Sequence, residues 1–136
     1  MKILGIDTSS KFLNIALGED NDIIMEESHL LDRKHSSYLV PKIKELLDKT
    51  KVRIKNIGVF VIGTGTGSFN GMRIGVSAIK GFGIVSGKLC IGVASMDSIA
   101  CNIQEEGRDI VHIIDAKRRQ VYTAIYRKKG NKIIRL

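Results

Sequence analysis

Hydrophobic and polar positions along this 136-residue chain predict a regular series of strands and helices. Short apolar or alternating segments bounded by turn residues are typical of strands, and apolar residues three and four positions apart are typical of helices. The expected strands are 2–7, 12–17, 22–28, 57–62, 89–93, 110–115, 120–126 and 133–134, and the expected helices are 35–49, 70–86 and 95–104. The order βββαβαβαβ up to residue 115 indicates an α/β domain, residues 1–116, in which helices lie on the faces of a mixed sheet.

Residues 117–136 are expected to lie outside this layered domain. The segment 120–126 alternates, and Lys129, Gly130 and Asn131 predict a turn before a last short strand. The chain is therefore expected to end in a β-hairpin. Because this hairpin follows a complete layer architecture, it looks like the beginning of a second unit.

The first predicted helix contains a residue that opposes it. Its apolar stripe is formed by Leu39, Val40, Ile43, Leu46 and Leu47. Pro41 has no backbone N–H to donate in a helix interior. We therefore expect the helix either to begin near Val40 or to have an irregular first turn, with Ser36 or Ser37 as the candidate N-cap.

The second predicted helix is apolar around most of its circumference. Its polar positions are Arg73, Ser77, Lys80 and Ser86. A surface helix of a layered domain needs to bury only one stripe, so this helix is expected to be covered a second time. A partner protein is the preferred cover, and the alternative is that the helix lies wedged between its sheet and the helix at 35–49.

The formal net charge of +8 comes entirely from the end of the chain. Residues 1–116 contain 14 basic and 14 acidic residues, whereas residues 117–136 contain eight basic residues and no acidic one. Any electrostatic attraction to a nucleic acid therefore belongs to the terminal hairpin. Only Tyr122 and Tyr126 are available there for base stacking, so a charged hairpin facing solvent or a partner is preferred over specific RNA recognition.

The segment GTGTGSFNG, residues 63–71, is the strongest local feature. It lies between a predicted strand and a predicted helix, where backbone N–H groups can hold an anion. Neither GxxxxGK[ST] nor GxGxxG matches it. A tight turn that allows close backbone packing is the preferred interpretation, and a phosphate loop using Gly65, Gly67 and Ser68 is the alternative.

Asp7, Thr8 and Ser9 follow the first predicted strand. A carboxylate beside two hydroxyls at the end of a strand suits a metal-bound phosphate. The preferred alternative is a turn in which Asp7 accepts hydrogen bonds from backbone donors. His35 has Leu39 where a helix would present a second ligand, so no metal site is predicted.

The beginning of the chain predicts no targeting segment. MKILGID reaches an aspartate too early for a signal peptide, and the longest uncharged segment, residues 56–72, is rich in glycine rather than membrane-like. A cytoplasmic protein is expected.

Four segments resemble the TsaB (YeaZ) family. They are ILGIDTSS at 3–10, HSSYLVPKIKELL at 35–47, GTGTGSFNGMRIGVSAIKG at 63–81 and IDAKRRQVYTAIY at 114–126. They occur in the family's order and cover the chain end to end. GSFNGMRIG, residues 67–75, is similar to the family's GSFTGLRIG, with Asn70 and Met72 substituted, and Thr66 stands where the family usually has proline.

The resemblance implies the actin-like ATPase (ribonuclease H-like) fold, followed by the first hairpin of an incomplete second subdomain. It also implies a noncatalytic role in forming N6-threonylcarbamoyladenosine at position 37 of transfer RNAs. The implied partners are a TsaD-type transferase, bound through the first two helices, and a TsaE-type ATPase, with a homodimer in isolation. The implied contact residues are Tyr38, Met72, Gly75, Val76 and Ile79.

The resemblance implies no intrinsic cofactor, with ATP or ADP bound at the contact between subunits. The residues of a reduced nucleotide site would be Asp7, Thr8, Ser9, Gly65, Gly67 and Ser68. Two alternatives remain open: an ATPase or phosphotransferase of the same superfamily, and a tRNA-binding module that uses residues 117–136. Family members usually continue further, so a naturally short member, a truncated chain and a degenerate paralogue are three explanations of the length.

Overall fold

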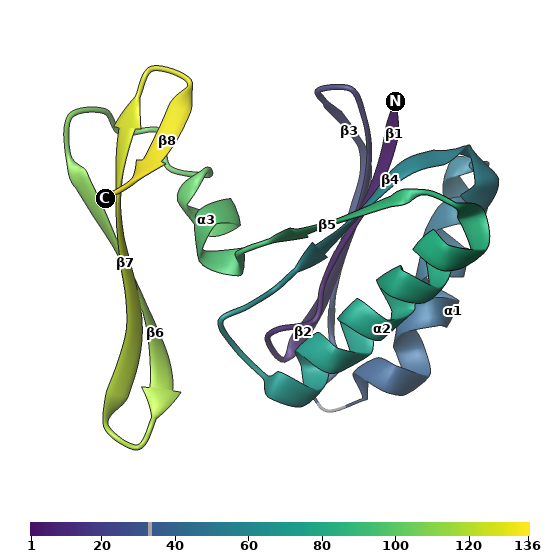
Figure 1. Cartoon of the computed structure of the whole chain (residues 1–136), viewed down its shortest axis with the longest axis horizontal. Helices are drawn as coiled ribbons and strands as arrows, with labels where there is room; N and C mark the ends of the chain where they lie inside the picture. Colours follow the sequence, from purple (N-terminus) through teal and green to yellow (C-terminus); the bar gives the residue numbers. More distant parts are fainter. Residues whose placement is uncertain (33) are drawn as a thin grey trace. The chain divides into compact units, whose positions relative to one another are not determined.

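A computed structural model describes residues 1–32 and 34–136, which form two compact units, Met1–Val93 and Ala94–Leu136 (Figure 1). Unit 1 contains β1 (Lys2–Asp7), β2 (Phe12–Glu19), β3 (Asp22–Leu30), α1 (His35–Thr50), the short 3-10 helix η1 (Ile54–Asn56), β4 (Ile57–Gly63), α2 (Phe69–Ser86) and β5 (Leu89–Val93). Unit 2 contains α3 (Ser95–Ala100), β6 (Asp109–Lys117), β7 (Gln120–Lys129) and β8 (Lys132–Arg135).

The sheet of unit 1 is mixed, with strand order β3-β2-β1-β4-β5. Strands β1, β2 and β3 form an antiparallel meander, and β4 and β5 continue the sheet parallel to β1. The parallel strands are joined by α2, as a parallel crossover requires. This confirms the mixed α/β sheet that the sequence predicted.

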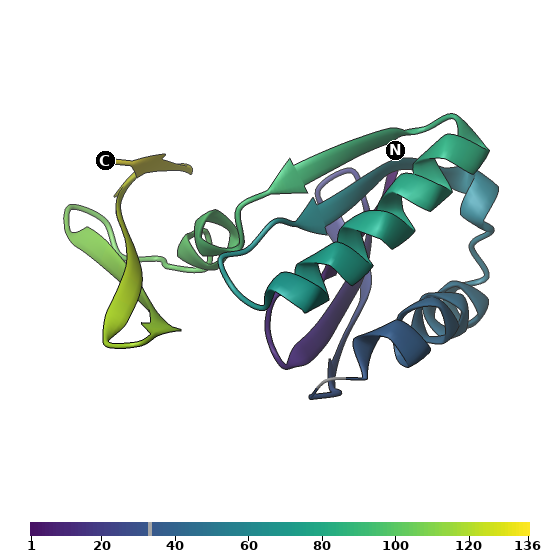
Figure 2. The same ribbon diagram turned by 60° about the horizontal axis from the view of Figure 1, so that its bottom comes forward.

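Helices α1 and α2 lie on the same face of this sheet (Figure 2). Their buried side chains join those of β1, β2 and β4 in one cluster, in which Leu4, Leu46 and Phe60 are completely buried. The stripe of α1 matches the predicted apolar positions, except that Val40 is exposed. Unit 1 is thus a two-layer structure, whereas the sequence led us to expect helices on both faces.

Helix α1 begins where the apolar pattern placed it, so the alternative start near Val40 is wrong. It starts at His35, and its N-cap is Lys34, with no side-chain capping bond. Ser36 and Ser37 therefore lie within the first turn and do not cap it. Proline is tolerated because it removes only the bond to the Ser37 carbonyl, on a side of the helix where Ser37 and Pro41 are exposed to water.

The sheet of unit 2 is antiparallel, with strand order β6-β7-β8. The strand expected at 110–115 does not join the first sheet: it is β6, and it pairs with β7 across a two-residue turn. Accordingly β6 belongs to the second of the two compact units, which begins at Ala94. Local hairpin pairing explains the difference, since strands joined by a short turn pair readily with one another.

Helix α3 is shorter than the segment 95–104 that the sequence predicted. It ends at Ala100 and packs Met96 and Ala100 on the second sheet. None of the helices described for this chain is long and apolar enough to cross a membrane.

Candidate functional site

The segment after β1 packs tightly against the glycine-rich segment before α2. The Ser68 N–H donates to the Ser9 carbonyl oxygen at 2.6 Å, and the Thr8 hydroxyl donates to the Gly71 carbonyl oxygen at 2.7 Å. Thr8 and Ser9 are both buried. These contacts fix the end of β1 to the start of α2.

Glycine is required in this segment because the backbones approach so closely. A Cβ atom at Gly67 would collide with the Ser9 carbonyl group, and one at Gly71 would collide with the Thr8 carbonyl group. No side chain could be accommodated without moving backbone atoms. The glycine pattern is therefore the close-packing turn that the sequence favoured.

Asp7 forms the turn that was preferred for it. Its Oδ1 accepts a hydrogen bond from the Ser9 N–H at 2.7 Å. The Ser68 side chain accepts from the Gly71 N–H and so caps the N-terminus of α2.

The residues predicted to bind a nucleotide therefore lie close together, but most of their polar atoms form hydrogen bonds within the fold. Thr8, Ser9 and Gly65 are buried, while Gly67 and Ser68 are exposed. Among residues 1–32 and 34–136, no group of three or more His, Cys, Asp or Glu side chains is placed to hold a metal ion.

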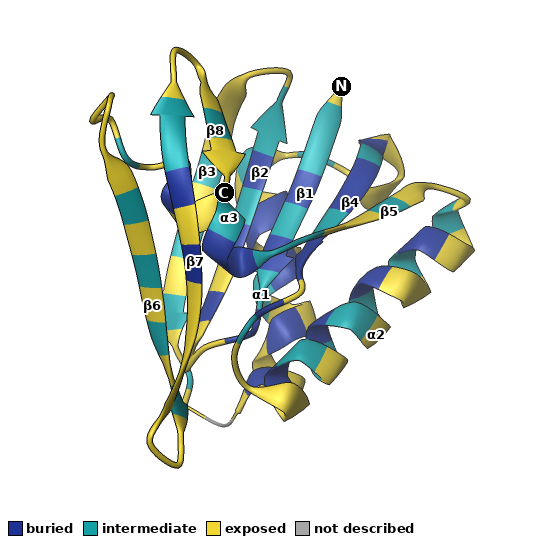
Figure 3. Ribbon diagram, turned by 60° about the vertical axis from the view of Figure 1, so that its left-hand side comes forward, coloured by how far each residue is buried: buried dark blue, intermediate teal, exposed yellow. Residues whose placement is uncertain are grey.

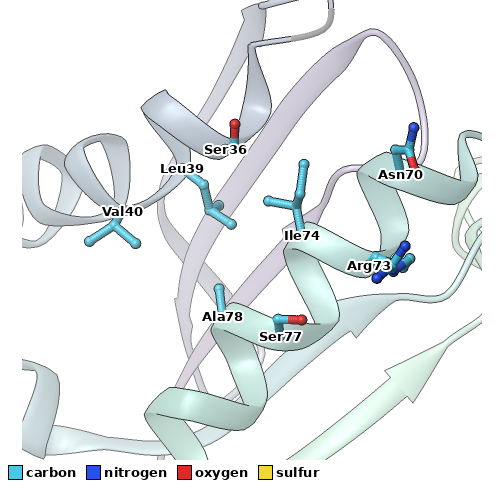
Figure 4. Close-up of a pocket in the computed structure, with 8 residues that line it drawn as sticks. All are labelled: Ser36, Leu39, Val40, Asn70, Arg73, Ile74, Ser77 and Ala78. Carbon is cyan, nitrogen blue, oxygen red and sulfur yellow. The ribbon is translucent and has the colours of Figure 1, made fainter.

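A surface groove of about 520 Å³ separates α1 from α2 (Figure 4). Ser36, Leu39 and Val40 come from α1, and Asn70, Arg73, Ile74, Ser77 and Ala78 come from α2. Leu39 and Ile74 form its apolar floor, and its rim carries the exposed Val40 and Arg73. A groove with an apolar floor and a polar rim suits a protein partner.

The predicted contact residues divide into two groups in the structure. Tyr38 is 41% exposed, and Met72 and Val76 are half-buried. Gly75 and Ile79 are buried: Gly75 packs against Thr8 and Ile62, and Ile79 belongs to the core. Gly75 and Ile79 therefore do not form part of a contact surface, because they face the sheet of their own unit.

The exposed side of α2 contains residues that the sequence analysis did not select. Figure 3 shows buried and exposed positions on opposite sides of this helix. Phe69, Ile84 and Val85 are exposed, with Val85 at 90%. The signal was present in the glycines at 71, 75 and 83, which mark the side that approaches the sheet and leave the opposite side for solvent or a partner.

The core of unit 2 is small and includes a polar contact. Met96, Ala100, Ala124 and Tyr126 are its buried members. The Tyr126 hydroxyl donates to Asp97 Oδ1 at 2.5 Å. Burial, helped by this bond to a carboxylate, raises the pKa of Tyr126 to about 12.

The basic residues of unit 2 are partly neutralised by its acidic residues. Arg127 pairs with Asp109 at 2.6 Å, and Lys117 pairs with Asp115 at 3.0 Å. These pairs hold the pKa of both carboxyl groups below their ordinary value, Asp109 through the Arg127 side chain and Asp115 chiefly through the Lys117 backbone N–H. Within the described part of the chain, Arg118, Arg119, Lys129 and Lys132 form no such ion pair. These four residues lie at the two turns of the sheet.

Comparison with known proteins identifies the family. The family model described as TsaD, tRNA N6-adenosine threonylcarbamoyltransferase, matches residues 28–135. The tRNA threonylcarbamoyladenosine biosynthesis protein TsaB of Bacillus subtilis is 34% identical over 130 residues, which are 96% of this chain and 57% of that protein. TsaB of Escherichia coli is 28% identical over 135 residues, 98% of this chain and 58% of that protein.

Solved structures confirm the fold. YeaZ from Pseudomonas aeruginosa superposes with a TM-score of 0.88 at 22% identity, covering 99% of this chain and 64% of that chain. RuvC of Thermus thermophilus, in complex with a Holliday junction substrate, superposes with a TM-score of 0.51 at 10% identity, covering 74% of this chain and 69% of that chain. The chain thus has the ribonuclease H-like, actin-like ATPase architecture, and it spans less than two thirds of the TsaB relatives that it matches. It belongs to the TsaB (YeaZ) family.

Proposed function

We propose that this chain is a noncatalytic partner in the formation of N6-threonylcarbamoyladenosine at position 37 of transfer RNAs. It binds a TsaD-type transferase through the surface formed by α1 and α2. The observation that carries the proposal is the groove between these helices, together with the apolar side chains that α1 and α2 expose to water. Residues such as Val40 and Val85 contribute nothing to the core of unit 1, and a partner would bury them.

The packing at the end of β1 supports a noncatalytic role. A phosphate site in this architecture needs hydroxyl and backbone N–H groups that are free to face the ligand. Here the Thr8 hydroxyl donates to Gly71, and the N–H groups of Ser9, Ser68 and Gly71 bond within the fold. An ATPase or phosphotransferase of the same superfamily would need these contacts to break.

The remaining partners follow from the family. A TsaE-type ATPase is proposed as a third component, with ATP or ADP held where subunits meet rather than within this chain. A homodimer through the α1–α2 surface is proposed for the isolated chain, because its exposed apolar side chains favour burial against any matching face. The cytoplasm is the proposed location, since transfer RNA is the substrate of the pathway.

Binding to the transferase tests this proposal. Val40→Glu places a charge on the groove rim, and Ser77→Arg fills the groove from α2. Both side chains are exposed, so the free energy of unfolding should change by less than about 0.5 kcal/mol, while affinity measured by calorimetry should fall by about tenfold or more.

Ile23→Glu is the matched control. Ile23 is an exposed aliphatic residue on β3 that does not line the groove. This variant should bind the transferase like the wild type. If both groove variants also bind like the wild type and restore reconstituted tRNA modification, the α1–α2 surface is not the contact.

A further inference from the structure

The turn between β6 and β7 is made of two arginines in an unfavourable conformation. Arg118 and Arg119 have φ of 52° and 61°, and Lys117 before them has φ of 66°. Two-residue hairpin turns with positive φ at both positions favour Asn-Gly, because side chains with a Cβ are disfavoured in the left-handed region. Three consecutive long basic residues are therefore held in a conformation that they do not prefer.

Asp115 holds this turn in place. Its Oδ1 accepts the Lys117 N–H at 2.7 Å, and its Oδ2 pairs with Lys117 Nζ at 3.0 Å. The strand register shifts between Asp115 and Lys117, as in a β-bulge. The carboxylate thus engages Lys117, and the two arginines at the tip keep their charge free of any described partner.

An exposed aromatic residue lies on β7 near this turn. Tyr122 is the third residue of β7 and is 47% exposed. It shares a face of β7 with Ala124 and Tyr126, which α3 helps to bury, so Tyr122 extends this face beyond its covered part. At about 3.3 Å per residue, Tyr122 is roughly 10 Å along the strand from Arg119.

The other turn of the same sheet provides an internal comparison. Gly130 and Asn131 join β7 to β8, between Lys129 and Lys132. Glycine takes the positive φ there, and the aromatic residue nearest to this turn on β7, Tyr126, is buried. The lysines that flank this turn have no positive φ. A hairpin turn can therefore be basic without arginines at positive φ. Strained residues of this kind concentrate at functional positions.

We propose that the β6–β7 turn binds single-stranded RNA. Arg118 and Arg119 contact phosphate groups, and Tyr122 stacks on an unpaired base. A guanidinium group matches a phosphate with two parallel N–H donors, and an aromatic face accepts any base of an RNA loop. The tyrosine favours RNA over an acidic protein or an anionic membrane, for which charge alone suffices. The choice of a tRNA anticodon loop as the natural ligand rests on the proposed function.

Fluorescence anisotropy with a labelled anticodon stem-loop RNA, across about 50–200 mM KCl, tests the proposal. The decisive variant combines Arg118→Asn with Arg119→Gly, which installs a turn sequence that this geometry favours. Its melting temperature should equal or exceed that of the wild type. Its affinity for the RNA should fall, and the slope of log affinity against log salt should decrease by about 1.4, or about 0.7 for each lost phosphate contact.

Three further variants separate stacking and geometry from net charge. Tyr122→Ala should weaken binding by about tenfold with little change of the salt slope, whereas Tyr122→Phe should bind like the wild type. Replacing both arginines by lysine should preserve the salt slope and still weaken binding, because the paired donors are lost. The charge-matched control, Lys129→Ala with Lys132→Ala, should keep most of the affinity.

Three results would overturn the proposal. They are equal losses from the two turns, equal affinity for a fully double-stranded RNA, and binding to anionic phosphatidylserine vesicles with the same dependence on Arg118 and Arg119. Transferase binding is measured in parallel. If the wild type binds the transferase but not the RNA, this inference alone is contradicted. If the wild type binds the RNA but not the transferase, only the proposed function is contradicted.

Discussion

The two units each contain an antiparallel three-stranded meander, and they differ in what covers it. In unit 1, β1, β2 and β3 are extended by two parallel strands and covered by α1 and α2, and the core cluster contains thirteen buried apolar residues among those that the structure describes. In unit 2, β6, β7 and β8 pack against the six-residue helix α3, and the core contains four buried residues. The same strand arrangement thus has very different amounts of apolar burial.

The difference is clearest on the second face of the unit 2 sheet. Val111 and Ile125 are partners in register, and Ile113 and Val121 alternate with them onto the same face. All four side chains are exposed. Because stability grows with buried apolar area, most of the stabilisation should come from unit 1. The two units should therefore respond differently to the same kind of substitution.

Truncation of Phe60 should have the largest effect. Phe60 is completely buried on β4 and stacks on Phe82 with 5.8 Å between ring centroids. Phe60→Ala should lower the free energy of unfolding by about 3–5 kcal/mol, measured by urea denaturation followed by circular dichroism. Ile113→Ala in unit 2, where the side chain is 61% exposed, should cost less than about 0.5 kcal/mol. Similar losses from the two variants would break the comparison.

A glycine pair on α2 should give the next largest effect. A Cβ at Gly71 meets the Thr8 carbonyl group, whereas a Cβ at Gly81 meets nothing within 4 Å. Gly71→Ala should therefore destabilise unit 1 by about 1–3 kcal/mol through overpacking. Gly81→Ala, in the same helix, should stabilise it by about 0.5–1 kcal/mol. Thermal unfolding of the two variants would show shifts of opposite sign, and a stabilised Gly71→Ala would contradict the close-packing account.

The polar contact of unit 2 should give a smaller and pH-dependent effect. Tyr126→Phe removes the hydrogen bond to Asp97 and should cost about 1 kcal/mol. Folding raises the pKa of Tyr126 from 10.0 to about 12. The stabilisation is therefore fully present below pH 10 and is lost as the pH rises through about 12. Tyrosinate absorbance should show one late-titrating tyrosine that the variant lacks, and an unchanged alkaline titration would argue against the buried contact.

Much of the fold was readable from the sequence, because periodicity reports which face of a segment is buried. The strands of unit 1 and the length of α2 follow from that pattern. The partner of β6 does not, since the same alternation fits either sheet. The alternative start of α1 near Val40 was wrong because Pro41 was weighed against a helix interior, although Pro41 and Ser37 both face water.

The candidate site was predictable only in part. The close-packing turn at the glycine segment and the turn at Asp7 followed from glycine spacing and from a carboxylate at a strand end, but the packing of one on the other did not. The burial of Gly75 and Ile79 did not follow from the apolar pattern, because apolar residues lie on most sides of this helix; only the glycines at 71, 75 and 83 marked the buried side. The positive φ of Arg118 and Arg119 could not be predicted from the sequence either, because such a turn favours Asn-Gly rather than two arginines.

The response to nucleotide should be the smallest effect, and it tests what the tight packing of unit 1 excludes. The backbone N–H groups of Ser9 and Gly71 and the Thr8 hydroxyl all bond within the fold, so phosphate would have to displace internal contacts. MgATP at millimolar concentration should therefore shift the melting temperature of the isolated chain by less than about 1 °C, because stabilisation grows only as RT ln(1 + [L]/Kd). Asp7→Asn should behave identically toward MgATP. A larger shift in the wild type that this variant abolishes would show that the end of β1 opens to bind phosphate. The contrast between a tightly packed unit 1 and a lightly covered unit 2 would then fail at the segment where unit 1 packs most closely.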